Sequence, residues 1–369
     1  MLKIMLVFGT RPEAIKMAPL FKEIESRKNI ESFICVTAQH REMLDQVLKI
    51  FNIKPKYDLN IMHSGQTLSS ITSKILDGID KVIRIEKPDI ILVHGDTTTA
   101  YVSALAAFYN QVKIGHVEAG LRTYNKYSPF PEELNRQMID RLSDYYFAPT
   151  KEAALNLLDE GIKEKSIFIT GNTAIDALKT TVNTKFNHSL FEWIGNSKLI
   201  LLTAHRRENL GDPLKNIFKA VNKILDDTDD VKIIYPIHLN PMIKNIANDY
   251  LKDSEKIKII PPLDVLDFHN FMNKSYLILT DSGGIQEEAP ALGKPVLVLR
   301  DTTERPEGIE AGTLKLIGTN AESIYKSTMS LLYNKNEYEK MANAINPYGD
   351  GTSSKQITDA LIRELNTIN

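Results

Sequence analysis

Charged residues follow several short apolar runs in this 369-residue sequence, at points where buried strands would end. Asp96 comes shortly after the run Ile90–Val93, and Glu118 comes directly after the run Ile114–Val117. A carboxylate at the end of an apolar strand is costly unless it is paired or faces a cleft. Both residues are therefore candidates for acid–base chemistry. The structural alternatives are that Asp96 caps the following helix and that Glu118 pairs with Arg122.

Two more charged segments lie where helices are predicted to begin. Arg11 stands in Gly9–Glu13, where a glycine turn leads into a helix whose N–H groups and the guanidinium could share an anion. Glu132 and Arg136 stand in Pro131–Arg136, at a helix start braced by prolines. An acidic residue such as Glu132 in a first helical turn often only stabilises the helix dipole. A single glycine turn, like the one before Arg11, is common and is therefore weak evidence for a binding site. Neither segment indicates a function by itself.

The second half of the chain carries two segments that suit a phosphate group. His205 begins a His-Arg-Arg cluster after an apolar run. Ser282, Gly283 and Gly284 lie between a strand and a helix, where glycines leave backbone N–H groups open to phosphate oxygens. Glu288 lies about one helical turn further on, where its carboxylate could accept hydrogen bonds from ribose hydroxyls. The alternatives are a solvated basic loop and an ordinary glycine turn.

A sheet of parallel strands would bring these positions together, since its ligands lie beyond the carboxyl ends of the strands. Short apolar runs alternate with segments of helical periodicity, which is typical of a doubly wound α/β sheet. The predicted strands of the first half are Ile4–Phe8, Phe33–Val36, Ile90–Val93, Ile114–Val117, Tyr146–Phe147 and Ile167–Ile169. Those of the second half are Leu199–Leu202, Ile233–Tyr235, Ile257–Ile260, Leu277–Leu279 and Val296–Leu299.

A polar interruption with weak periodicity, residues 184–197, separates the two series of strands. We therefore predict an α/β fold of two Rossmann-like domains facing a central cleft, with residues 1–183 in the first domain and residues 184–352 in the second. The last segment, Ser353–Leu365, has the pattern of an amphipathic helix. Its periodicity does not indicate which domain it packs against.

Composition excludes several classes of function. The formal net charge of -2 gives no electrostatic case for a nucleic-acid or membrane-surface partner. The apolar start Met1–Val7 predicts a buried strand rather than a signal peptide. Cys35 is the only cysteine, and no Cys/His cluster has metal-ligand spacing, which favours a cytoplasmic protein without a metal. Neither a Gly-x-Gly-x-x-Gly nor a Walker A motif is present, so nicotinamide cofactors and P-loop ATP hydrolysis lack support.

Taken together, the motifs closely resemble those of the non-hydrolysing UDP-N-acetylglucosamine 2-epimerases, over nearly the whole chain. The motifs that carry the resemblance are Gly9-Thr10-Arg11-Pro12-Glu13, His94-Gly95-Asp96-Thr97, His116-Val117-Glu118-Ala119-Gly120-Leu121-Arg122, Pro131-Glu132-Glu133-x-Asn135-Arg136, Thr203-x-His205-Arg206-x-Glu208-Asn209 and Asp281-Ser282-Gly283-Gly284. The resemblance implies a GT-B type of fold with the active site in the cleft and a UDP-binding second domain. The C-terminal helix, about residues 353–369, is expected to return to the first domain. A cytoplasmic homodimer without a dissociable metal or nicotinamide cofactor is also implied.

The resemblance implies reversible conversion of UDP-N-acetylglucosamine (UDP-GlcNAc) into UDP-N-acetylmannosamine (UDP-ManNAc), an activated sugar for bacterial surface polysaccharides. Departure of UDP from C1 makes the C2 hydrogen acidic, and loss of that proton gives 2-acetamidoglucal. Re-addition of UDP, with a proton on the opposite face, then inverts C2. The implied catalytic residues are Asp96, Glu118, Glu132 and His205. The implied UDP-binding residues are Arg11, Lys16, Arg136, His205, Ser282, Gly283, Gly284 and Glu288, although Lys16 and Arg136 could equally have surface or structural roles.

Members of the family often have a second, regulatory UDP-GlcNAc site, which would make the enzyme allosteric. Gln39, His40 and Gln66 match positions associated with that site. Glu42 and Gly65 depart from the pattern, because some members carry Gln and Arg there.

Three alternatives remain open at this point. A hydrolysing relative would release free ManNAc, but such relatives generally differ in the segment Pro131–Arg136. A GT-B glycosyltransferase would need an acceptor pocket, and three carboxylates exceed what simple sugar transfer usually requires. A non-catalytic UDP-sugar sensor would be expected to lose the carboxylates or the histidine, which this sequence keeps.

Overall fold

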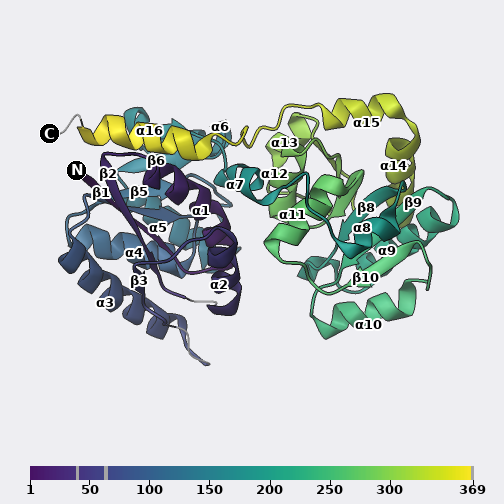
Figure 1. The fold of residues 1–369 in the computed structure, drawn as a ribbon, viewed down its shortest axis with the longest axis horizontal. Coiled ribbons are helices and arrows are strands. Elements are labelled where there is room, and N and C mark those ends of the chain that lie inside the picture. The colour runs from purple at the N-terminus through teal and green to yellow at the C-terminus, as the bar shows by residue number, and fades with distance from the viewer. Residues whose placement is uncertain (39–40, 62–64, 367–369) are drawn as a thin grey trace. The chain divides into compact units, whose positions relative to one another are not determined.

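The structure is a computed structural model that describes residues 1–38, 41–61 and 65–366. The chain forms two compact units (Figure 1). The first unit contains Met1–Thr180 together with the C-terminal segment from Tyr348, and the second contains Thr181–Pro347. Each unit is built on one sheet of parallel strands, which confirms the predicted class of two Rossmann-like α/β domains.

The sheet of the first unit has the strand order β3-β2-β1-β4-β5-β6-β7, and all neighbouring strands are parallel. Its strands are β1 (Leu2–Phe8), β2 (Ile30–Val36), β3 (Tyr57–Asp58), β4 (Ile90–His94), β5 (Lys113–Val117), β6 (Tyr145–Ala148) and β7 (Ile167–Ile169). The winding direction changes between β1 and β4. Ligands of doubly wound sheets bind at this switch point, beyond the carboxyl ends of the strands. The turns after β1 and β4 are therefore the expected places for chemistry.

The helices of the first unit are α1 (Arg11–Glu25), α2 (Arg41–Ile50), α3 (Leu68–Glu86), α4 (Thr98–Tyr109), α5 (Glu132–Leu142), α6 (Lys151–Asp159), α7 (Thr173–Thr181) and α16 (Ser353–Asn366). Side-chain caps fix where several of them begin, and Thr97, for example, accepts a hydrogen bond from the N–H of Ala100 at the start of α4.

The C-terminal helix α16 packs against α1 of the first unit (Figure 1). Its first turn is held by Asp176 of α7, whose carboxylate accepts the N–H groups of Ser353 and Ser354 at 3.2 and 2.8 Å. A negative charge at a helix N-terminus stabilises the helix through its unpaired N–H groups. Arg27, just beyond α1, adds an ion pair to Asp359 of α16 at 2.9 Å.

The second unit repeats this design with the strand order β10-β9-β8-β11-β12-β13, again parallel throughout. Its strands are β8 (Lys198–Thr203), β9 (Val231–Pro236), β10 (Ile257–Ile260), β11 (Leu277–Thr280), β12 (Val296–Val298) and β13 (Leu314–Leu316). Its helices are α8 (Ser189–Ile194), α9 (Asp212–Asp226), α10 (Pro241–Tyr250), α11 (Val265–Lys274), α12 (Gly283–Ala291), α13 (Pro306–Glu310), α14 (Ala321–Tyr333) and α15 (Lys335–Ala342). The winding direction changes between β8 and β11.

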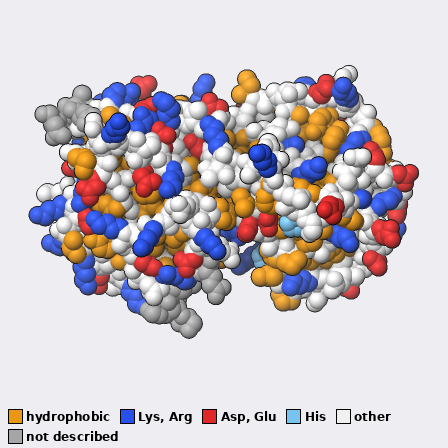
Figure 2. Space-filling view, in the orientation of Figure 1, with side chains coloured by type: hydrophobic (Ala, Val, Ile, Leu, Met, Phe, Trp, Pro, Cys, Tyr) orange, Lys and Arg blue, Asp and Glu red, His pale blue; other side chains and the backbone are white. Residues whose placement is uncertain are grey.

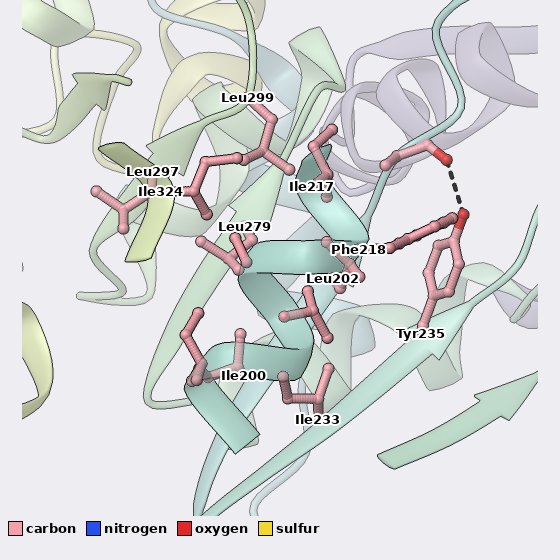
Figure 3. Packing of buried hydrophobic residues seen from close by; sticks show 14 of the residues in the cluster. Ile200, Leu202, Ile217, Phe218, Ile233, Tyr235, Leu279, Leu297, Leu299 and Ile324 are labelled. Atoms are coloured by element: carbon pink, nitrogen blue, oxygen red, sulfur yellow. Dashed lines mark hydrogen bonds between the residues drawn. The ribbon is translucent and has the colours of Figure 1, made fainter. Parts of the chain in front are cut away.

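The core of the second unit lies between its sheet and the helices that cover it, α9, α10 and α14 (Figure 3). Phe218 of α9 is fully buried, and its ring lies 5.7 Å from that of Tyr235 on β9. The Tyr235 hydroxyl, at the edge of this core, donates a 2.9 Å hydrogen bond to the carbonyl of Ala204. Because Ala204 directly precedes His205, the core also supports the backbone at the end of β8.

All eleven predicted strands are confirmed, and the differences concern short elements. The strands β3 and β13 were not predicted, since two or three residues give too little pattern to recognise. The polar interruption at residues 184–197 contains the helix α8, which buries Ile194. Its Phe191 ring packs 5.0 Å from that of Phe271 on α11. Tertiary packing therefore stabilises a helix whose own periodicity is weak.

Acidic and basic side chains are interspersed over the face shown in Figure 2. None of the helices in the described part of the chain is long and apolar enough to cross a membrane.

We expect Phe218→Ala to lower the free energy of unfolding of the second unit by about 3–5 kcal/mol, because a fully buried ring is replaced by a cavity. Trp193, the only tryptophan, lies in this unit, so its fluorescence during denaturant unfolding reports the loss. Met242→Ala, at an exposed position of α10, serves as control and should change stability by no more than about 0.5 kcal/mol. Equal losses in both variants would contradict this description of the core.

Candidate functional site

Asp96 lies in the turn between β4 and α4, and α5 holds it there. Its carboxylate accepts a hydrogen bond from Arg136 at 2.5 Å, and its backbone carbonyl accepts one from the Asn135 amide at 2.9 Å. Thr97, and not Asp96, caps α4, so the structural alternative for Asp96 is wrong. Both the side chain and the backbone of Asp96 are therefore tied to α5.

The surroundings of Asp96 raise the pKa of its carboxyl group above the ordinary value. Burial is the main cause, and the nearby negative charges of Glu118 and Glu132 add to it. The positive charges of Arg136 and Lys16 act in the opposite direction. These five side chains thus lie close enough to influence one another, and the structure brings five of the predicted site residues together.

Glu118 lies directly after β5, with backbone φ of +67°, an uncommon conformation for a residue other than glycine. Its carboxylate pairs with Lys16 of α1 and accepts a 2.9 Å hydrogen bond from the Asn172 amide. His94 Nε2 lies 3.8 Å from the same carboxylate oxygen. The predicted structural alternative, a pair with Arg122, is wrong, since Arg122 binds Asp140 and Glu160 instead.

Arg11 occupies the first position of α1, as predicted, and is half-buried. The preceding turn is held by the buried carboxyl group of Glu13, which accepts the N–H groups of Gly9 and Thr10 at 3.1 and 2.8 Å. Glu13 also accepts the hydroxyl of Thr97 at 2.8 Å. One side chain therefore joins the turn after β1 to the turn after β4.

In the second unit, Asp281 organises the ends of β8 and β11. Its fully buried carboxylate accepts the backbone N–H groups of His205 and Arg206 at 2.7 and 2.8 Å and the Asn209 amide at 3.0 Å. The hydroxyls of Thr203 and Thr280 join the same two strand ends at 2.6 Å. The histidine and arginine are therefore presented next to the start of α12, which follows Asp281.

The start of α12 is suited to bind an anion. Ser282 is half-buried, and Gly284 is exposed. A Cβ atom on Gly283 would lie 3.5 Å from a guanidinium nitrogen of Arg206 and 3.7 Å from one of Arg305. Backbone N–H groups at a helix N-terminus and two guanidinium groups thus meet around one glycine, which is the arrangement that phosphate groups favour.

His205 and Glu288 flank this helix start. The His205 ring stacks on His238 at 5.5 Å, and burial lowers its pKa. Glu288 lies on α12 with one carboxylate oxygen 3.4 Å from Nε2 of His269, whose Nδ1 bonds the Thr181 hydroxyl at 2.7 Å. The second unit therefore contains all the predicted UDP-binding residues of the second half of the chain, around α12 and the end of β8.

The residues matched to a regulatory site are only partly described. Gln39 and His40 lie outside the described residues. Gln66 is half-buried just before α3, and Gly65 has φ of +76°. Among the residues that the structure describes, no group of three or more His, Cys, Asp or Glu side chains could hold a metal ion.

Sequence reasoning did not identify two residues that belong to these clusters. Asn172 contacts Glu118, and it lies three residues beyond β7, where the rule of strand ends could have found it. Arg305 precedes Pro306 at the start of α13, and its place beside Gly283 has no local signal in the sequence. Its guanidinium also pairs with Glu287 of α12.

Two parallel-sheet units, with carboxylates at the strand ends of one and a helix start suited to an anion in the other, are those of a GT-B-like enzyme. Residues 22–362 match the sequence profile of the UDP-N-acetylglucosamine 2-epimerase family. The chain is 60% identical over 361 residues to a UDP-N-acetylglucosamine 2-epimerase of Bacillus subtilis, covering 98% of this chain and 95% of that protein. The chain therefore belongs to the UDP-N-acetylglucosamine 2-epimerase family, and it is an isomerase.

Solved structures agree with this assignment. A putative UDP-N-acetylglucosamine 2-epimerase from Listeria monocytogenes is 56% identical, with a TM-score of 0.96 over 100% of this chain and 98% of that one. The UDP-GlcNAc 2-epimerase of Neisseria meningitidis, solved with UDP-GlcNAc bound, is 49% identical, with a TM-score of 0.88 over 98% of this chain and 100% of that one.

His94 gives a pH-dependent prediction. Burial lowers its pKa to about 3, although Glu118 opposes this effect. The unfolded chain binds a proton at this residue below about pH 6.5, whereas the folded protein does not, so the stability contributed by neutral His94 is lost as the pH falls from 6.5 toward 3. Relative to His94→Asn, the native protein should lose up to about 1.4 kcal/mol per pH unit in that window. Urea unfolding at several pH values measures the difference, with pH 8 as the internal reference. A pH-independent difference would contradict the burial of a neutral ring.

Proposed function

We propose that the protein catalyses reversible C2 epimerisation of UDP-GlcNAc to UDP-ManNAc without hydrolysing the sugar. The observation that carries this proposal is the pair of carboxylates, Asp96 and Glu118, held in different environments beside the switch point of the first sheet. The UDP-GlcNAc bound to the Neisseria meningitidis relative supports the same substrate here.

The reaction needs a leaving group before it needs a base. The C2 hydrogen is not adjacent to a carbonyl group, so direct removal of its proton would leave an unstabilised carbanion. When the C1–O bond breaks, its electron pair leaves with UDP, and C1 becomes positively charged. A carboxylate then takes the C2 proton, and the C2–H electrons form the double bond of 2-acetamidoglucal. The reverse addition, with a proton delivered to the other face, gives the epimer.

The environments of the two carboxylates suggest a division of roles. Glu118 faces the ammonium group of Lys16 and the amide of Asn172, which suits a carboxylate that accepts a proton. The raised pKa of Asp96 suits a carboxyl group that holds a proton and donates it. Glu132 is the third carboxylate of the cluster, close enough to raise the pKa of Asp96.

The groups around α12 are assigned to the departing UDP. The helix N-terminus at Ser282–Gly284, together with Arg206 and Arg305, would stabilise the negative charge that develops on the diphosphate. His205 and Arg11 are further candidates for the same task. Glu288 would accept hydrogen bonds from the uridine ribose.

The family resemblance also supports predictions that go beyond the reaction. These are a cytoplasmic homodimer and a product that supplies ManNAc for bacterial surface polysaccharide. An allosteric UDP-GlcNAc site at Gln39, His40 and Gln66 likewise remains a prediction.

Proton NMR of the purified protein with UDP-GlcNAc in deuterated water tests the proposed function. We expect UDP-ManNAc to appear beside the substrate, with deuterium at C2 of both sugars. Glu118→Gln should reduce both epimerisation and deuterium exchange by at least about a hundredfold, because the proton acceptor is lost. Glu152→Gln, at an exposed position of α6, is the control and should retain full activity. Accumulation of free ManNAc and UDP would instead indicate a hydrolase, and an unchanged spectrum would exclude epimerisation.

The anion site is tested by a matched pair of neighbouring arginines. Arg206 reaches Gly283, whereas Arg207, the first residue of the short 3-10 turn Arg207–Asn209, is exposed. We expect Arg206→Gln to raise KM for UDP-GlcNAc and Kd for UDP about tenfold or more, since a charge-assisted hydrogen bond contributes about 1.5–3 kcal/mol. Arg207→Gln should leave both constants nearly unchanged. Calorimetric titration with UDP and steady-state kinetics measure them, and equal effects would contradict the assignment.

A further inference from the structure

His116 of β5 is fully buried, and both nitrogens of its ring have a partner. Nε2 lies 2.7 Å from the backbone carbonyl oxygen of Gly95, and Nδ1 lies 2.6 Å from a carboxylate oxygen of Asp140 on α5. A carbonyl oxygen can only accept a hydrogen bond, so Nε2 must donate. An ionised carboxylate can also only accept, so Nδ1 must donate as well.

The ionisation of Asp140 follows from its other contacts. Its second carboxylate oxygen lies 2.7 Å from the guanidinium of Arg122 and accepts the N–H of Gly120 at 3.3 Å. The guanidinium of Arg122 is always charged, so its contact with Asp140 favours the ionised carboxylate whatever the state of His116. Arg122 is in turn held by two hydrogen bonds to Glu160, at 2.6 and 2.9 Å. A doubly protonated ring makes the buried set neutral, with two positive and two negative charges.

The ring of His116 lies where it can hold the turn between β4 and α4 in place. Gly95 has φ of +63°, and its N–H donates to Val117 of β5 at 2.9 Å. Its carbonyl is held by His116, which is held by Asp140 of α5. The next residue, Asp96, is bound to α5 through Asn135 and Arg136. Both peptide groups of the turn are thus tied to one helix, and His116 supplies one of the two attachments.

We propose that His116 is a positioning residue, a buried imidazolium that donates from both ring nitrogens and so fixes the Gly95–Asp96 turn against α5 for proton transfer. The inference rests on the proposed function, because proton transfer by Asp96 is the task that the turn serves. The alternative is that His116 is a neutral histidine with only a packing role. A neutral ring carries one proton, so either the carbonyl oxygen of Gly95 or the carboxylate of Asp140 would face an unprotonated nitrogen at hydrogen-bonding distance.

The protonation state can be measured without any assumption about activity. The native protein is labelled with 15N-histidine, and two-bond nitrogen–proton correlations are recorded at neutral and mildly alkaline pH. We expect both ring nitrogens of His116 to resonate in the protonated range. The signal is assigned through the backbone and by its absence from His116→Asn. One nitrogen in the unprotonated range at neutral pH would overturn the proposal.

Kinetics test the positioning role. His116→Asn should lower kcat for epimerisation about a hundredfold with little change in KM, because a displaced Asp96 impairs proton transfer and not substrate binding. Tyr146→Phe is the matched control. Tyr146 is the partner of His116 on the neighbouring strand β6, and its hydroxyl lies 2.8 and 2.6 Å from the backbone carbonyl oxygens of Asp140 and Ser143. The substitution removes this hydroxyl and keeps the side chains of His116 and Asp140 unchanged. Its kcat should remain close to that of the native protein.

Each outcome is decisive. Retention of kcat by a folded His116→Asn variant overturns the positioning role, and so do equal losses of kcat in His116→Asn and Tyr146→Phe. If His116→Asn does not fold, Asp140→Asn takes its place, since it removes the charge that holds the ring while leaving the ring present, and the same loss of kcat is expected. If the native protein itself does not epimerise UDP-GlcNAc, the proposed function fails, whereas the NMR result still decides the state of His116.

Discussion

The attachment of the Gly95–Asp96 turn to α5 is the interaction on which the proposed acid–base site of the first unit depends. The turn follows a fully buried strand, and its glycine adopts a left-handed conformation that a side chain would disfavour. Three side chains of α5 reach it, through Asn135, Arg136 and, by way of His116, Asp140. A turn fixed at both peptide groups can direct a carboxylate with little loss of order on reaction, which is how preorganised sites lower a barrier.

In the second unit, a buried carboxylate fixes the backbone at a strand end. Asp281 accepts two consecutive backbone N–H groups, from His205 and Arg206, and thereby fixes the end of β8 beside the start of α12. A fully buried charge is tolerated here because three hydrogen bonds compensate its desolvation. In both units the side chains proposed to bind or react are at least partly exposed, whereas His116, Asp140 and Asp281, which orient them, are buried. Substitution of a side chain that binds or reacts should remove its contact with the substrate. Substitution of a buried orienting group should instead displace such a side chain.

The parts of this design that depend on periodicity could be predicted from the sequence. The alternation of apolar runs and helical segments was sufficient for the two parallel sheets, and the strand-end rule was sufficient to select Asp96 and Glu118. What could not be predicted are contacts between residues far apart in the chain. Nothing near Glu118 indicates that its partners are Lys16 and Asn172 rather than Arg122, which follows four residues later. The same holds for Arg305, whose side chain reaches the start of α12 from another segment.

The proposed reaction is reversible, and this requirement agrees with the opposing effects on the pKa of Asp96. A group that donates a proton in one direction must accept it in the other, so neither protonation state can be too costly. Burial and the negative charges of Glu118 and Glu132 favour the protonated form of Asp96, while Arg136 and Lys16 favour the ionised form. If burial acted alone, the pKa of the carboxyl group would be raised further, and the ionised form would be more costly. Arg136 is therefore more than a support for the turn, because its charge favours the ionised state of Asp96, the form in which the carboxylate can take a proton.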